Sequence, residues 1–551
     1  MVSDLAVADF KITVDGTELS DAAIRDLTLI RVEESLTLPA SFMVRFFDPE
    51  FALVDQPVMA VGAEVEIAVG WENPLTTIMK GEVTGVTVEA RDSGSVELVV
   101  TGFDKMHRAL RGSKAQTYQN QSDADVAKKI AGEAGLTPDV DATGDPHDYL
   151  FQINESDHQF LRNRARRLGF TFWVSDGKLH FKKGARPAAT IEAVWGENLL
   201  RLKARMSAVG YVNEVQVRGW DPDTQKEIVG KSTSNGFDPS SATFYTEHLT
   251  KTNSAFSAKT RATGRFPVDS QAEADALAGS MRERLSTAGL VVRGEIEGDP
   301  AVGAGTSITL SGVGTRLGGE YLVTSVEHLF STNRQYRTRF VSSGPEPSQL
   351  PDLLSGVIDA TGQVHTGVGL SVGIVTNLND PDALGRVRVK LPTAADTGES
   401  FWARVVSPGA GDGRGLQSLP SVNDEVLVGF EHGDARKAFV IGGLWSKKYK
   451  PPESTFQDQG KVQKHFWRST KGHGVQIDDE GDGTLALTLK GVKSQLKVTK
   501  AETTLESESK LILKGSDIEV TATGKLTLKG ANIEINGSSD VTIKGGMIKL
   551  N

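Results

Sequence analysis

The sequence contains one match to the G-x-S-x-G pattern of serine hydrolases, at residues 369–373, with Ser371 at its centre. In a hydrolase this pattern forms a sharp turn between a strand and a helix, and the turn exposes the serine. Here a Pro- and Ser-rich stretch precedes the pattern and a strand-like run follows it. We therefore expect no catalytic serine at this position.

An acidic run at residues 478–483, Asp-Asp-Glu-Gly-Asp-Gly, is similar to the start of a calcium-binding loop. The bidentate glutamate that completes such a loop would stand at position 489, which is Leu489. A turn is therefore favoured, and weak cation binding is left open. The ten histidines show neither H-x-x-x-H nor H-E-x-x-H spacing, and the chain has no cysteine. The sequence predicts no metal site within one chain. A metal shared between chains on a symmetry axis is left open.

Two further patterns could carry chemistry. Glu155 and Asp157 could be the paired carboxylates of a glycosidase. They stand where a helix is expected to start, and carboxylates there cap free N–H groups and complement the helix dipole, so this role is preferred. The glycine-rich stretch 409–415 lacks the G-K-[ST] ending of a phosphate loop and is expected to be a loop between strands. The sequence thus predicts no catalytic residue, no cofactor and a protein that is not an enzyme.

Length and composition restrict the class of protein. A chain of 551 residues with 38% hydrophobic residues and 58 glycines is expected to fold into several turn-rich domains. The net charge of −10 argues against a general nucleic-acid binder. No apolar run is long enough to span a membrane, and the N-terminus lacks the basic and apolar segments of a signal peptide. We therefore expect synthesis in the cytoplasm.

The elements that would position these residues are mainly β. Short strand-like runs follow one another over residues 10–100, which is typical of a barrel or sandwich. Strand patterns return over 191–341. The sequence therefore predicts a hub of β-barrel domains from residues 1–111 and 189–341, interrupted by a small α/β insertion at 112–188.

Three helices are expected to interrupt the strands. One begins after a capping-box-like Ser122 and ends at Gly135, and a second begins near Ser156. A third is expected from Ser270 to about Leu285, again with a capping box, formed by Ser270 and Glu273. The second carries a basic face, for which a solvated surface or a subunit contact is preferred over a nucleic-acid site; its arginines are Arg162, Arg164, Arg166 and Arg167.

A Pro- and Ser-rich linker is predicted at 342–370, followed by five short strands at 371–450 that fit an OB-type barrel. OB barrels often bind single strands or sugars through exposed aromatic residues. In this barrel the aromatic residues alternate with aliphatic ones, so a role in the core and in a subunit interface is preferred; they are Phe401, Trp402, Phe430, Phe439 and Trp445. Residues 451–483 are expected to form a neck.

Residues 484–551 carry a repeat of apolar-x-apolar pairs whose first members lie alternately 7 and 8 residues apart. Both members of a pair fall on one face of a strand, and that face needs another surface to cover it. An intertwined trimeric β-helix, a needle, is preferred over a single-chain solenoid. Its predicted core is Leu496, Val498, Leu505, Leu511, Leu513, Ile518, Val520, Leu526, Leu528, Ile533, Ile535, Val541, Ile543, Ile548 and Leu550. Strand edges exposed at the end of the needle would need a cover, so a capping partner is expected at Met547, Ile548, Lys549, Leu550 and Asn551.

Residues 152–170 read Gln-Ile-Asn-Glu-Ser-Asp-His-Gln-Phe-Leu-Arg-Asn-Arg and end in Gly-Phe. This stretch resembles the Q-x-x-E-S-D-x-x-F-L-x-R…G-F signature of the VgrG family. Residues 379–389 with 423–426 and 442–444 resemble that family's OB domain. The resemblance covers nearly the whole chain. It implies a trimer that fuses the hub and spike of a contractile phage tail, sits in a baseplate and is driven through a target envelope, often with a PAAR-repeat protein on its tip.

The chain departs from some relatives, because no lysozyme domain fits between barrel and needle and no effector domain follows the needle. It most resembles the spike of an extracellular contractile injection system; a type VI secretion VgrG and a phage tail spike stay open. The expected partners are two further copies of the chain, a PAAR-like tip protein, inner-tube and baseplate proteins and, transiently, the target membrane, with no nucleic acid. The alternatives are a spike with cryptic muralytic activity and an OB-based glycan or nucleic-acid binder.

Overall fold

The computed structural model describes residues 8–55, 59–72, 74–92, 94–183, 190–208, 211–234, 240–257, 259–264, 266–287, 289–331, 334–343, 369–392, 399–453 and 457–549. The chain forms two compact units, Met1–Leu444 and Trp445–Asn551. The first unit is built mainly from β-strands, as the sequence predicts, and the described strands of the second unit lie between Gln457 and Glu506. Most of the predicted linker lies outside the described residues.

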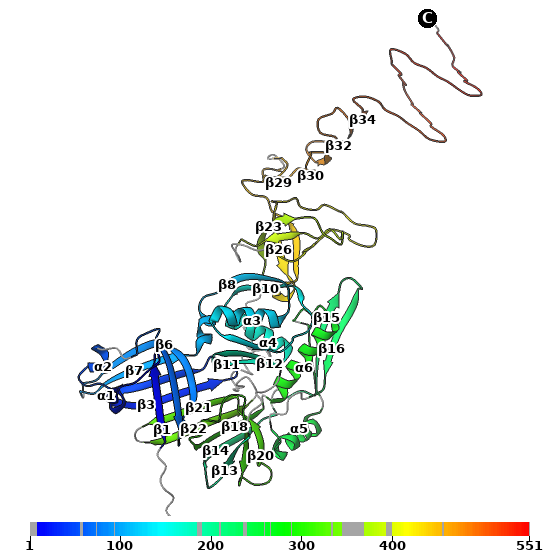
Figure 1. The fold of residues 1–551 in the computed structure, drawn as a ribbon. Coiled ribbons are helices and arrows are strands. Elements are labelled where there is room, and N and C mark those ends of the chain that lie inside the picture. The colour runs from blue at the N-terminus through cyan, green and yellow to red at the C-terminus, as the bar shows by residue number, and fades with distance from the viewer. Residues whose placement is uncertain are drawn as a thin grey trace, which may run out of the picture. The chain divides into compact units, whose positions relative to one another are not determined.

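The first unit is organised around an eleven-stranded antiparallel sheet (Figure 1). In spatial order its strands are β14 (Leu199–Met206), β18 (Leu290–Glu297), β22 (Arg334–Ser343), β21 (Ser325–Ser331), β3 (Leu27–Ser35), β4 (Ser41–Phe47), β7 (Val96–Phe103), β6 (Thr76–Ala90), β5 (Glu64–Gly70), β1 (Asp9–Val14) and β2 (Thr17–Glu18). Alternate residues of β4, such as Phe42 and Val44, are buried. The β3–β21 pairing joins the two halves of the hub across the insertion.

The insertion has its own apolar core between two helices and two small sheets. Its helices are α3 (Asp123–Ala134) and α4 (Asp157–Leu168). Its strands are β8 (Lys114–Gln121) paired with β10 (His147–Glu155), and β11 (Phe170–Ser175), β12 (Lys178–Lys183) and β9 (Thr137–Val140) in the order β11–β12–β9. The buried side chains of α3 and α4 pack against both sheets, so the insertion is an α/β layer attached to the hub.

The predicted helix starts are confirmed. The Ser122 hydroxyl accepts a hydrogen bond from the Asp125 N–H, and the Asp125 carboxylate accepts one from the Ser122 N–H, which is a complete capping box. Gly135 follows α3 with φ of 77°, a conformation that favours glycine. The Ser156 hydroxyl caps α4 by accepting a hydrogen bond from the Gln159 N–H.

Helix α6 (Gln271–Thr287) also begins where the sequence predicts, but its capping box is incomplete. The Ser270 hydroxyl accepts from the Glu273 N–H at 3.1 Å. The Glu273 carboxylate accepts from the Asp269 N–H at 2.9 Å instead of from Ser270. The Glu273 carboxylate also contacts Arg167 and Arg436, so local capping alone does not decide its position.

The prediction of a solvated basic face on α4 is wrong. Arg164 and Arg166 are buried, and the Arg164 Nη2 lies 3.1 Å from a carboxylate oxygen of the buried Asp123. The Arg167 Nη2 donates to the Glu273 carboxylate at 2.7 Å. Helix α4 packs against α3 and α6, so Arg164 and Arg167 meet acidic partners inside the first unit.

The sequence did not predict a third small layer, in which α6 covers a sheet of β16 (Lys226–Ser232), β15 (Glu214–Asp221) and β17 (Thr260–Thr263). Helix α5 (Thr243–Phe256) was also missed, because its N-cap is Ala242, which supplies no side-chain cap. The remaining small elements are the sheet of β13 (Thr190–Val194), β19 (Ser307–Ser311) and β20 (Gly319–Leu322), the short helices α1 (Asp21–Asp26) and α2 (Ala52–Asp55), and the 3-10 helices η1 (Lys105–Leu110) and η2 (Glu431–Gly433).

The OB region forms a five-stranded barrel in the order β24 (Arg388–Lys390), β23 (Ser371–Asn377), β26 (Glu425–Phe430), β27 (Ala438–Gly443) and β25 (Arg404–Val405). Two reciprocal backbone hydrogen bonds between Val387 and Ala403, of 2.9 and 2.7 Å, join its two edges. The core is aliphatic, with Val375, Val426 and Val428 fully buried.

The expected place of the barrel's aromatic residues is corrected in part. None of the five is fully buried, and Trp445 is 69% exposed. Phe430 packs against the edge of the aliphatic core. Phe401 faces the insertion, where its ring centre lies 6.0 Å from that of Tyr149. Aliphatic β-branched residues fill the narrow barrel, and the larger rings are left at its margin.

A buried ionic cluster joins the barrel to the rest of the first unit. Arg436, next to η2, donates from Nη2 to the Pro267 carbonyl at 3.1 Å and to the Asp434 carboxylate at 2.9 Å. Its Nη1 lies 3.4 Å from the same Glu273 oxygen that Arg167 contacts. One carboxylate on α6 therefore serves an arginine from the insertion and another from the barrel.

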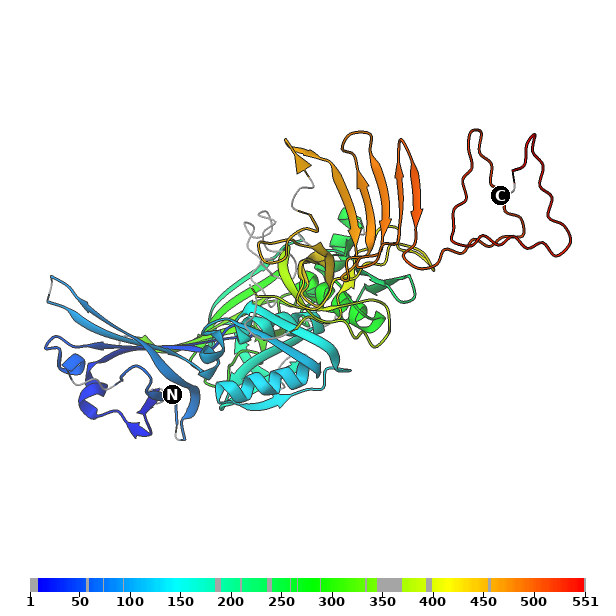
Figure 2. The same cartoon turned by 90° about the horizontal axis from the view of Figure 1, so that it is seen from above.

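The second unit contains a short hairpin, β28 (Gln457–Asp458) and β29 (Lys461–Val462), and then an antiparallel meander. The meander strands are β30 (Lys464–Arg468), β31 (Gly474–Asp478), β32 (Thr484–Thr488), β33 (Gln495–Thr499) and β34 (Thr503–Glu506), each paired with the next. They lie side by side in orange in Figure 2. Strands β30 and β31 fall within residues 451–483, which are predicted to form a neck. The meander therefore begins earlier than the predicted needle, at Lys464.

Candidate functional site

The meander β30–β34 has one apolar face and one polar face. Residues directly opposite each other in an antiparallel pair share a face. Ile477 stands opposite Leu485, Leu485 opposite Val498, and Leu496 between Leu487 and Leu505. The alternate positions are mostly polar, as in Gln495, Lys497 and Thr499 of β33. We name the apolar face the aliphatic ladder; it comprises Trp467, Val475, Ile477, Leu485, Leu487, Leu496, Val498 and Leu505.

No part of the described second unit buries the aliphatic ladder. Leu485 and Leu487 are each 43% exposed, and Leu505 is 53% exposed. A row of aliphatic side chains of this length is rarely left in water by a soluble monomer. The ladder is therefore an exposed apolar surface of the second unit.

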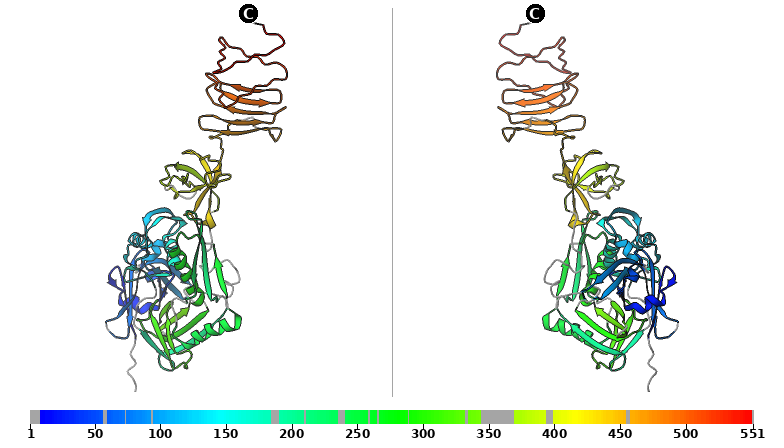
Figure 3. Two further views of the ribbon diagram at one scale, coloured as in Figure 1. Left: turned by 90° about the vertical axis from the view of Figure 1, so that its right-hand side faces the viewer. Right: turned by 90° about the vertical axis from the view of Figure 1, so that its left-hand side faces the viewer.

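Beyond β34 the chain continues to run back and forth, and residues 507–549 form no strand within this chain (Figure 3). The predicted needle residues in this stretch are all at least half exposed, from 50% for Val541 to 67% for Leu528. Met547 and Ile548 of the predicted tip are also exposed, and Leu550 and Asn551 lie outside the described residues. The apolar side chains of residues 507–549 therefore extend the exposed apolar surface of the aliphatic ladder, and no part of the described second unit buries them.

The motifs that could have carried chemistry lie in turns and at strand starts. Ser371 opens strand β23, so a strand and not a helix follows the G-x-S-x-G pattern. The acidic run 478–483 is the turn between β31 and β32, where Asp482 pairs with Lys500 at 2.9 Å. The stretch 409–415 is a loop between β25 and β26. Across the described ranges, no group of three or more His, Asp or Glu side chains is arranged to hold a metal ion.

Glu155 and Asp157 flank the N-cap of α4, as expected, but neither performs the capping, which falls to Ser156. Asp157 is buried; one of its oxygens accepts from Gln152 Nε2 at 2.9 Å, and the other lies 2.7 Å from Lys114 Nζ. Glu155 accepts from Asn163 Nδ2 at 2.9 Å. Burial raises the pKa of Glu155 from 4.5 to about 7, against the lowering effect of the Asn163 hydrogen bond and of Arg164.

The raised pKa of Glu155 predicts a pH dependence of stability. Between pH 4.5 and about 7 the folded chain holds a proton that the unfolded chain has lost, so the free energy of unfolding falls as pH rises through this window. Glu155→Gln keeps the acceptor for Asn163 and removes the titration. We expect this variant to be more stable than the wild type by about 2 kcal/mol at pH 8, with little of this gain at pH 4.5, in chemical denaturation.

Glu227→Gln, at an exposed carboxylate, is the matched control and should show no such pH-dependent difference. An equal effect of Glu155→Gln at both pH values would contradict the titration of Glu155.

The Glu155→Gln variant also tests the muralytic alternative. That alternative requires that the wild type turn over peptidoglycan and that this activity be lost in the variant.

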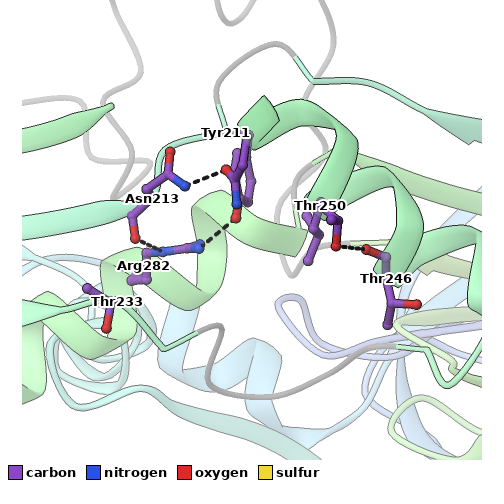
Figure 4. A pocket seen from close by; sticks show the side chains of 8 residues that line it. Tyr211, Asn213, Thr233, Thr246, Thr250 and Arg282 are labelled. Atoms are coloured by element: carbon purple, nitrogen blue, oxygen red, sulfur yellow. Dashed lines mark hydrogen bonds between the residues drawn. The ribbon is translucent and has the colours of Figure 1, made fainter. Parts of the chain in front are cut away.

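A cavity of about 480 Å³ opens between α5, α6 and the segments that precede β15 and follow β16 (Figure 4). On its wall the Arg282 guanidinium stacks over the Tyr211 ring at 4.9 Å and donates to the Tyr211 hydroxyl at 3.1 Å. Arg282 also donates from Nε to the Asn213 carbonyl at 3.2 Å. The remaining lining is amide, hydroxyl and leucine, without a carboxylate or histidine, so these walls supply no acid–base pair.

The family model for the Alg8 N-terminal domain matches residues 4–332, which is more than half of the chain. The chain belongs to this family. A second model, for the type VI secretion system/phage-baseplate injector OB domain, matches residues 371–445 of this Alg8-type chain and covers the barrel β23–β27. The description of the Alg8 family names a domain and not a reaction. No curated protein matches the sequence.

Three solved structures are similar to this Alg8-type chain. The Francisella PdpA–VgrG complex is 8% identical, with a TM-score of 0.51 over 92% of this chain and 81% of that one. A 43 kDa tail protein of prophage MuSo2 from Shewanella oneidensis is 15% identical, with a TM-score of 0.49 over 61% and 98%. An E. coli type VI secretion component is 14% identical, with a TM-score of 0.48 over 79% and 99%. The chain has the fold of a VgrG-like hub and spike, as recognised from the sequence.

Proposed function

We propose that the chain is the central hub and spike of a contractile, phage-tail-like injection machine. Three copies assemble through the aliphatic ladder and the repeat that follows it. The first unit joins the inner tube and the baseplate, and the second forms the piercing needle. A particle of the extracellular contractile type is favoured over a type VI secretion system or a phage tail.

The observation that carries this proposal is the aliphatic ladder together with the exposed repeat 507–549. Each apolar side chain of this surface stabilises an assembly by about 1.5–3 kcal/mol when it is fully buried. A single-chain solenoid would bury these side chains within one copy, whereas here they stay exposed. Three copies that close their ladders on a common axis cover the apolar faces and leave the polar faces in water.

The end of the repeat supports a tip partner. Met547 is 77% exposed and Ile548 is 53% exposed, next to the charged Lys549. Apolar side chains at a blunt end of strands invite a cover from another chain. We propose that a PAAR-like tip protein provides this cover, and that it meets the target membrane first.

The role as a spike is mechanical and requires no catalysis by this chain. Interlocked strands of three chains resist local opening, because release of one strand breaks its pairing with the neighbours. No helix in the described ranges is both long and apolar enough to cross a membrane. The chain is therefore proposed to act as a component of an assembled particle, loaded after synthesis in the cytoplasm.

The mass of the purified protein tests the proposal most directly. We expect light scattering of the full-length chain to give about 177 kDa, which is 3 × 59.1 kDa. A chain that stops at Lys450 retains the first unit but lacks the ladder, and we expect its mass to fall toward that of one copy on dilution.

The trimer and the binding-module alternative predict different results. A full-length chain that stays near 59.1 kDa, also in the presence of tip and tube proteins, would contradict the trimer. The binding-module alternative predicts instead that the barrel binds a glycan or nucleic acid with a strong salt dependence. The barrel's aromatic residues give that alternative little support, because all of them except Trp445 are only partly accessible and Phe401 faces the insertion.

A further inference from the structure

Three polar side chains form a hydrogen-bonded row across the sheet β11–β12–β9 of the insertion. The Ser175 Oγ lies 2.9 Å from the His180 Nε2, and the His180 Nδ1 lies 2.8 Å from an Asp139 carboxylate oxygen. This is the order and spacing in which a serine nucleophile, its general base and the carboxylate that orients the base are arranged in serine hydrolases. We propose that Ser175, His180 and Asp139 form a nucleophilic serine site for small carboxylic esters.

The backbone register holds these three residues together. Asp139 stands directly opposite His180 in the parallel pair β9–β12, and Trp173 stands opposite His180 in the antiparallel pair β11–β12. Ser175 is two residues beyond Trp173 on the same strand, so it shares that face of the sheet. The opposite face carries Leu179 and Phe181, which are buried in the core of the insertion.

The surroundings of His180 orient its ring. The Trp173 ring stacks on it with centres 4.9 Å apart and planes 12° apart, and the histidine side chain is only 16% exposed. A carboxylate only accepts hydrogen bonds, so Nδ1 carries the proton and donates to Asp139. In the neutral imidazole the Nε2 atom is then free of hydrogen and accepts from the Ser175 hydroxyl, which is the tautomer that a general base requires.

Lys182 keeps the carboxylate ionised. Its Nζ lies 2.5 Å from the second oxygen of Asp139 and 3.0 Å from Asp141. Hydrogen bonds from Lys182 and His180 lower the pKa of Asp139. An ionised Asp139 stabilises the imidazolium that forms when His180 takes the serine proton.

Ser175 is one of the residues that line a cavity of about 650 Å³, whereas His180 and Asp139 are not. The His180 Nε2 lies 2.9 Å from the Ser175 Oγ, so the base is next to the part of the wall where an ester would meet the serine. Ile78 and Met79 give the wall an apolar part, and acidic side chains outnumber the two lysines. This lining favours an uncharged or cationic ester over a carboxylate or a phosphate.

The turn after Ser175 supplies donors for the oxyanion. Asp176 and Gly177 have φ of 49° and 72° and link the strands as a two-residue turn, with Ser175 paired to Lys178. Both residues lie outside the β11–β12 pairing and line the same cavity, so their N–H groups are the candidate oxyanion donors. In serine hydrolases the N–H of the residue after the nucleophile is a usual oxyanion donor.

The proposed reaction is balanced with water as the only co-reactant. Ser175 Oγ forms a bond to the acyl carbon while its proton passes to His180 Nε2. The bond from the acyl carbon to the alcohol oxygen then breaks, and the alcohol leaves with that proton. Water attacks the acyl-serine, gives one proton to His180, and releases the acid as the Ser175 hydroxyl is restored.

An alkyl fluorophosphonate probe tests the site in the full-length protein. The probe forms a bond between phosphorus and the serine oxygen and loses fluoride. We expect labelling of the peptide that contains Ser175, detected by mass spectrometry, and a loss of at least about 100-fold in Ser175→Ala and His180→Gln. Ser371→Ala, in the G-x-S-x-G pattern that a strand follows, should label like the wild type.

A second measurement uses the absence of cysteine from the chain. The Ser175→Cys variant carries a single thiol next to His180, and we expect iodoacetamide to alkylate it at least about 10-fold faster than the thiol of Ser371→Cys. Adding His180→Gln should remove this advantage. This readout does not depend on whether Ser175→Ala folds.

The proposal would be overturned by either of two results. One is a wild type that the probe does not label, or labels equally after Ser175→Ala. The other is equal alkylation rates of the two thiols. The inference goes beyond the mechanical role, and the assembled mass of Ser175→Ala should equal that of the wild type, so failure of the serine site and failure of the trimer are distinguishable.

Discussion

Replacing Ile533 and Ile535 together by Asp in the full-length chain is expected to abolish the trimer. The two side chains are 56% and 63% exposed in one copy, and assembly would bury both of them in every copy. Loss of six buried isoleucines removes on the order of 10 kcal/mol per trimer. Six carboxylates near one axis add repulsion and a desolvation cost. Light scattering should show a mass near that of one chain at micromolar concentration.

Glu534→Lys provides the matched control, because residue 534 lies between the two isoleucines and faces the opposite side of a strand. This variant changes the charge of each copy by two without placing a charge on the axis. We expect its mass to remain near 177 kDa, three times 59.1 kDa. A doubly substituted Asp chain that keeps this mass would reject the repeat as the assembling surface.

The second large effect is expected from Glu273→Ala. This carboxylate meets Arg167 at 2.7 Å and Arg436 at 3.4 Å, and both guanidinium groups are mostly buried. The two arginines and the Asp269 N–H hold the pKa of Glu273 far below its usual range against the effect of burial. Removing it leaves two buried cations without their shared partner, which costs about 3–5 kcal/mol. Thermal unfolding of the first unit should shift down by several degrees.

Glu227→Ala removes the carboxylate of an exposed ion pair and should change the unfolding temperature little. Glu273→Gln keeps an acceptor of the same shape and should fall between the alanine variant and the wild type. We further expect protease to release the barrel faster in Glu273→Ala, because the cluster joins α6 to Arg436 of the barrel. Equal shifts for Glu273→Ala and Glu227→Ala would show that the cluster adds no stability.

Local sequence signals predicted the parts of the fold that depend on local physics. Ser122 with Asp125, Ser156 and Gly135 lie at helix ends as predicted, because capping involves residues within one turn. The repeat after residue 484 predicted apolar pairs that share one face of a strand, as Leu496 and Val498 do in β33, because a strand's period of two needs no knowledge of its neighbours. Their burial in a trimer stays a prediction. The mainly β class and the OB barrel follow from the same signals.

Features that depend on long-range packing were not predictable. The arginines of α4 look like a solvated face until α6, more than a hundred residues later, brings Glu273 against them. The ladder starts at β30 because Trp467 and Ile477 stand in register with the later leucines, although they lie outside the repeat. Ser175 and His180 are near in sequence, but only the parallel β9–β12 pairing adds Asp139.

In the proposed trimer, the meander β30–β34 would determine the order in which the needle forms. Each strand pairs with its immediate successor in the chain, so only short loops must close and register is set within one copy. Such hairpins form in microseconds, whereas the meeting of three chains depends on concentration. Pre-formed sheets would then dock first, and the stretch 507–549, which forms no strand within one copy, would wind up afterwards from β34 toward the end of the repeat. Synthesis of three chains on one messenger would raise their local concentration, and the needle would close soon after the last strand leaves the ribosome.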